Sequence, residues 1–109
     1  MADTFKIIAQ SNPSAATLTD AYTSPASTST TISSIVVANR SATGTSFRIS
    51  VAQAGAADDN KQYLYYDVAI AGNDTFVATI GVTLAATDVL RVYATLATLS
   101  FNVFGVQVA

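Results

Sequence analysis

The chain has 109 residues, of which 50% are hydrophobic and only 11% charged, and its formal net charge is −2. This length suits one folding domain, residues 1–109, and leaves no room for a second. The sequence contains no histidine, cysteine, tryptophan or glutamate, so the usual general bases, thiol nucleophiles and soft metal ligands are missing. We therefore expect a structural or binding protein rather than an enzyme, with no cofactor and no metal.

The low charge also bears on partners. A pI near 4.5 provides no concentrated positive field for nucleic acid. The apolar content predicts that some surface is buried in a homo-oligomer, a trimer or a dimer, although alanine raises the mean hydropathy while burying little. The first ten residues carry Asp3 and a short apolar run, which fits neither a signal peptide nor a membrane anchor.

Alternation of apolar and polar residues with a period of two predicts about eight strands, at residues 5–10, 17–23, 31–39, 46–53, 62–70, 75–83, 89–95 and 99–108. Turn-forming residues separate them, as in Ser11-Asn-Pro13 and Gly72-Asn-Asp74. No segment has a convincing helical period. The expected fold is an all-β antiparallel two-sheet sandwich, jelly-roll-like, in preference to a small barrel.

The same alternation predicts which side chains form the core. Residues 62–70 should place Leu64 and Tyr66 inward and both Tyr63 and Tyr65 on the opposite face. The last strand carries two apolar sets displaced by one residue, which indicates either a bulge near Gly105 or a strand buried on both faces. The full set of expected inward positions is Phe47, Ile49, Val51, Leu64, Tyr66, Val68, Phe76, Ile80 and Phe101.

Tyr63 and Tyr65 are the candidate site, because exposed aromatic side chains mark contacts. We expect them to form a subunit interface; the alternative is a platform on which a sugar stacks, with Asp67 and Gln62 nearby. Residues 58–60, Asp-Asp-Asn, contain oxygen ligands for calcium but lack the spacing of a calcium loop, so a solvated turn is expected. The dispersed Arg40, Arg48 and Arg91 favour surface packing over a phosphate site.

The chain also resembles small β-rich virion proteins of tailed bacteriophages. The resemblance is carried by packing and turn signatures at residues 18–26, 35–41, 47–51, 63–67, 73–76, 81–90 and 101–105. It implies a non-enzymatic structural subunit of the virion, assembled in the host cytoplasm, that decorates or cements the head shell by binding itself and other virion proteins such as the major capsid protein. The alternatives are a neck or tail appendage and a carbohydrate-binding receptor module.

Overall fold

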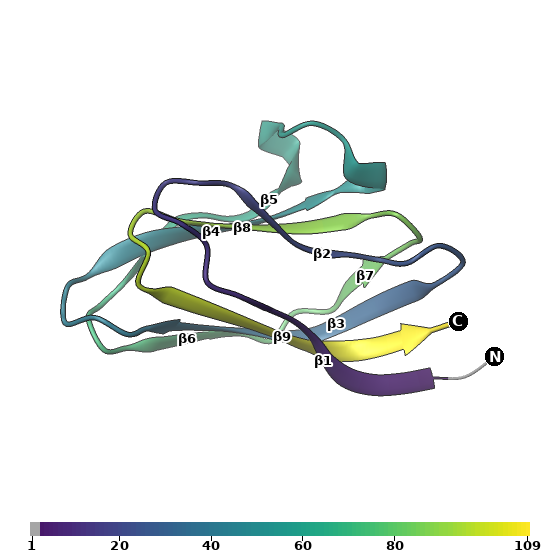
Figure 1. Cartoon of the computed structure of the whole chain (residues 1–109), viewed down its shortest axis with the longest axis horizontal. Helices are drawn as coiled ribbons and strands as arrows, with labels where there is room; N and C mark the ends of the chain where they lie inside the picture. Colours follow the sequence, from purple (N-terminus) through teal and green to yellow (C-terminus); the bar gives the residue numbers. More distant parts are fainter. Residues whose placement is uncertain (1–2) are drawn as a thin grey trace.

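Two antiparallel sheets pack face to face in the computed structural model, which describes residues 3–109 (Figure 1). Two short 3-10 turns, η1 (Gln53–Gly55) and η2 (Asn60–Gln62), lie between the fourth and fifth strands. The strands are β1 (Asp3–Ser11), β2 (Thr19–Thr23), β3 (Ser29–Asn39), β4 (Thr45–Ala52), β5 (Tyr63–Ile70), β6 (Thr75–Ala78), β7 (Val82–Leu84), β8 (Val89–Ala94) and β9 (Leu99–Val108).

The strand order is that of a jelly roll. Sheet A has the order β1-β9-β3-β6, with β7 also paired to β3, and sheet B has the order β2-β8-β4-β5. When β6 and β7 count as one strand, this is the eight-strand order of two Greek keys, and successive strands change sheet except for β4 and β5, which pair within sheet B. The all-β, two-sheet prediction is therefore confirmed. In Figure 1 sheet B lies above sheet A, and the teal segment carrying η1 and η2 rises beyond sheet B.

The single strand expected at residues 75–83 is divided into β6 and β7. β6 pairs with Ile35–Ala38 of β3 and β7 pairs with Thr30–Ile32. Between these two ladders β3 contains a bulge at residue 33, so the chain opposite leaves the ladder at residues 79–81 and rejoins it afterwards. Three steps along β3, from Ile32 to Ile35, face four along residues 78–82, so the division coincides with the bulge in the partner strand.

The core lies between the inner faces of the two sheets. Phe47, Ile49 and Phe101 are fully buried, as their alternation predicts, and the rings of Phe47 and Phe101 meet edge to face with centroids 6.1 Å apart. The expected inward residues Val51, Val68, Phe76 and Ile80 are partly buried and pack against this core. The predicted inward placement of Leu64 and Tyr66 is wrong, because the pairing of β5 is irregular.

The last strand, β9, is central in sheet A, between β1 and β3. Its own alternation is regular, and the bulges fall in its neighbours, between Ile7 and Ala9 of β1 and between Ile32 and Ser34 of β3. Gly105 lies beside both bulges, and a Cβ there would come 2.1 Å from the Thr31 carbonyl oxygen. β9 is therefore central, as one sequence-based alternative expected, but it is buried on one face only, because Phe104 and Val106 on its outer face are partly exposed.

Candidate functional site

An arginine stacked between two tyrosines lies on the outer face of sheet B. The guanidinium carbon of Arg48 is 4.2 Å from the ring centroid of Tyr66 and 4.4 Å from that of Tyr93. Its Nε donates to the Asp67 carboxylate at 2.6 Å, and this hydrogen bond is the main cause that raises the pKa of Arg48. We call Arg48, Tyr66, Asp67 and Tyr93 the Arg48 cluster.

The cluster exists because β5 is irregular. Phe47 pairs with Val68 and Ile49 pairs with Tyr65, so two steps along β4 correspond to three along β5. The extra residue is accommodated by Asp67, whose φ of 52° lies in the left-handed region that aspartate tolerates better than most residues. This bulge turns Tyr65 inward, and a second irregularity, between Ile49 and Ser50 of β4, returns Tyr63 to the outer face.

The predicted facing of β5 is accordingly wrong for three residues. Tyr65 points inward, with its ring 5.4 Å from that of Phe76 and 6.5 Å from that of Phe47. Leu64 and Tyr66, expected in the core, are 41% and 56% exposed. Tyr63 lies on the outer side, as expected, and contacts Tyr66. The outer aromatic pair is therefore Tyr63 and Tyr66 instead of Tyr63 and Tyr65.

Tyr63, Tyr66 and Asn60 line a hollow of about 390 Å³, which we call the ring hollow. The rings of Tyr63 and Tyr66 are perpendicular, at 89°, with centroids 5.0 Å apart. The Tyr63 hydroxyl donates to Asp58 Oδ1 at 2.8 Å. The pKa of Tyr63 is raised, mainly because the hydroxyl is partly buried and to a smaller extent because of this hydrogen bond. The hollow thus combines two fixed aromatic surfaces with an amide.

The loop beside the ring hollow, residues 53–62, is held down by its own contacts. Asp59 begins η2 by accepting a hydrogen bond from the Lys61 amide. Arg91 on the outer face of β8 donates to the carbonyl oxygens of Ala56 and Gly55 and to the Asp20 carboxylate. Asp58 accepts from the Tyr63 hydroxyl at the start of β5, so both carboxylates of residues 58–60, expected to form a turn, have protein partners.

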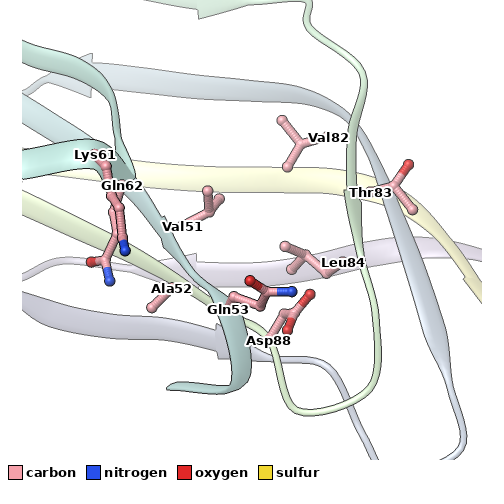
Figure 2. Close-up of a pocket in the computed structure, with 9 residues that line it drawn as sticks. All are labelled: Val51, Ala52, Gln53, Lys61, Gln62, Val82, Thr83, Leu84 and Asp88. Atoms are coloured by element: carbon pink, nitrogen blue, oxygen red, sulfur yellow. The ribbon is translucent and has the colours of Figure 1, made fainter. Parts of the chain in front are cut away.

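A second hollow lies at one end of the sandwich, where β4, β7 and the loop after β7 converge (Figure 2). Two of its polar side chains already have partners: Asp88 accepts from the amides of Ala54 and Ala85, and the Gln62 amide bonds within its own loop. Its volume is about 290 Å³, and its lining is Val51, Ala52, Gln53, Lys61, Gln62, Val82, Thr83, Leu84 and Asp88. These bonds hold the loops at this end of the sandwich in place, so we interpret the polar groups as structural.

The outer face of sheet A is apolar near its free edge. Phe5 and Ile7 of β1 are 80% and 51% exposed. Register places them opposite Val106 and Phe104 of β9, so all four side chains share one face. We call these four residues the apolar face. Exposed apolar groups that gather in this way mark contact surfaces more often than isolated ones.

The structure therefore rearranges the predicted site. Gln62 is buried with its amide engaged, and Asp67 is paired with Arg48, so neither is free for the sugar platform suggested by the sequence. The sequence pattern does not mark Tyr66 or Tyr93 as site residues, and it marks Asn60 only as part of the turn at residues 58–60. The one sequence signal for the rearrangement is Tyr65-Tyr66-Asp67 itself, two adjacent large rings followed by a residue that accepts a positive φ.

Comparisons with protein families, with curated proteins and with solved structures found no match. Within residues 3–109 there is no helix of the length and hydrophobicity needed to cross a membrane. The same residues contain no group of three or more acidic side chains placed to hold a metal ion.

Proposed function

We propose that the chain is a non-enzymatic structural subunit of a bacteriophage particle, attached to the head shell as a decoration or cement protein. The observation that carries this proposal is the apolar face. Phe5 and Ile7 leave most of their side chains in water, which is unfavourable until a second surface covers them.

The free edge of sheet A favours packing through this face over addition of another strand. β1 is the edge strand, and Lys6 alternates with Phe5 and Ile7, so its charge points to the inner side of the edge. Inward charges and bulges on an edge strand discourage open-ended pairing, and β1 has both. Association through the apolar face can therefore remain a closed, symmetric contact.

The setting in a virion comes from the resemblance to phage structural proteins and agrees with the jelly-roll fold. Jelly rolls occur in viral capsid proteins and also in lectins, so fold alone does not choose between them. An adhesive subunit needs many modest contacts rather than one strong site, since attachment is multivalent. The apolar face supplies such a contact.

The test combines association in solution with position on particles. We expect the wild-type chain to form an oligomer, a trimer or a dimer, and Phe5→Ser with Ile7→Ser to weaken it without unfolding the exposed strand. Leu96→Ser, at an exposed apolar residue in a corner, is the matched control. Monomeric wild-type protein at tens of micromolar would contradict the oligomer.

Imaging of particles that carry a tagged copy tests the location. Density over the head shell in many copies supports decoration, and density at the neck or tail would move the protein to an appendage. Absence of the chain from purified particles would overturn the virion assignment altogether.

A further inference from the structure

We propose that the ring hollow binds a hexopyranose unit of a neutral glycan. The inference concerns sheet B and is independent of the apolar face, which lies on sheet A. It uses Tyr63, Tyr66 and Asn60, of which only Tyr63 belonged to the sugar platform suggested by the sequence.

The shape of the hollow fits a ring with an apolar and a polar side. Two tyrosine rings meet at 89° and border a space of about 390 Å³ with Asn60. A pyranose presents C–H groups on its faces and hydroxyl groups around its edge. Its C–H face can pack on one tyrosine ring while its hydroxyls reach the polar atoms at the rim.

Several polar atoms at the rim of the hollow have no hydrogen-bond partners among the described residues. The Asn60 carboxamide and the Tyr66 hydroxyl make no hydrogen bond to any side chain or backbone group within residues 3–109. An amide both donates and accepts, as a sugar hydroxyl does. Asp58 uses Oδ1 for the Tyr63 hydroxyl, so its other carboxylate oxygen faces no described partner and can accept from the ligand.

The charges around the hollow favour a neutral ligand. Arg48 is neutralised by Asp67, and its guanidinium carbon lies over the rings of both Tyr66 and Tyr93. At and beside the hollow, the carboxylates Asp58, Asp59 and Asp67 outnumber the cations Arg48 and Lys61, which opposes an anionic sugar or a phosphate. The Tyr66 ring already carries the Arg48 guanidinium at 4.2 Å, so part of its capacity for a cation–π contact is used before an ammonium ligand arrives.

The site is also held in place before any ligand arrives. Tyr66 is stacked on Arg48, Tyr63 is bonded to Asp58, and Arg91 fixes the loop that carries Asn60. Few side chains must lose freedom on binding, which lowers the entropic cost. If the protein assembles as proposed, many weak sites on one particle would act together.

The experiment is a screen of the full chain against neutral hexose oligosaccharides, followed by ligand-observed NMR with methyl hexopyranosides. We expect wild-type binding, and Tyr66→Ala to weaken it by about tenfold or more, the usual effect of losing a central aromatic contact. Asn60→Ala removes only an exposed amide and should also reduce binding, so the test does not depend on how well the Tyr66 variant folds.

Two controls separate the outcomes. Leu64→Ala, an exposed residue of the same strand that does not line the hollow, should bind like the wild type. Phe5→Ser should lose self-association but keep glycan binding at a single site. This variant therefore separates the glycan proposal from the proposed assembly through the apolar face. The proposal is overturned by no binding at millimolar sugar, by binding only to anionic glycans or to tetramethylammonium, or by binding that neither the Tyr66 nor the Asn60 variant reduces.

Discussion

Replacing Tyr65 by alanine tests the facing of β5 directly. The Tyr65 ring packs against Phe76 and Phe47 with centroids 5.4 and 6.5 Å away. Each such aromatic contact is worth about 0.5–1.5 kcal/mol beyond the buried area, and a fully buried Phe→Ala change costs about 3–5 kcal/mol. Because Tyr65 is only partly buried, we expect Tyr65→Ala to lower the free energy of unfolding by about 2–3 kcal/mol.

The matched variant is Tyr66→Ala, one residue further along the strand. Tyr66 is 56% exposed and contacts Arg48 and the Tyr63 ring; at an exposed position the cation–π contact is worth about 0.5–1 kcal/mol. Phe47→Ala, in the centre of the core, sets the upper reference at about 3–5 kcal/mol.

Thermal and urea unfolding, followed by circular dichroism, give the comparison. For a domain of this size, about 1 kcal/mol shifts the Tm by roughly 4 °C, so Tyr65→Ala should melt about 10 °C below the wild type and Tyr66→Ala within about 4 °C of it. Equal effects of the two variants, or a larger effect of Tyr66→Ala, would refute the inward placement of Tyr65 and the bulge at Asp67.

Three further outcomes are expected. Gly105→Ala should reduce stability strongly, by about 2 kcal/mol or more, because the added methyl meets the Thr31 carbonyl oxygen; urea unfolding measures this, and a neutral effect would contradict the close approach. Arg91→Ala should cost about 1–2 kcal/mol and speed limited proteolysis within residues 53–62, since it removes the bonds that hold this loop; unchanged cleavage would refute the anchoring role. The raised pKa of Tyr63 means that the folded state favours its protonated form, so this contribution to stability is complete below the unfolded pKa of about 10 and is lost as the pH rises through the folded value. Alkaline melting curves should show that loss in the wild type and not in Tyr63→Phe.

The fold class followed from the sequence because its determinants are local. Two-residue alternation and turn residues such as Pro13 and Gly72 need only near neighbours to act, and they located the strands and the main core residues, Phe47 and Phe101 among them. With strands this short and closely connected, a two-sheet sandwich is among the few ways to bury one face of each.

The candidate site depended on irregularities that only the tertiary structure decides. The bulges in β1 and β3 arise from pairing with β9, a strand distant in sequence, and the bulge at Asp67 arises in the pairing of β5 with β4. Each shift of one residue moves the side chains up to the next irregularity to the other face. The bulge at Asp67 placed Tyr66 beside Arg48 and put Tyr65 in the core. The apolar face likewise requires β9 to be central and β1 to pair with it, which brings Phe5 next to Val106 from the opposite end of the chain. Alternation along one strand reports which residues share a face, whereas the sheet as a whole decides which face is buried.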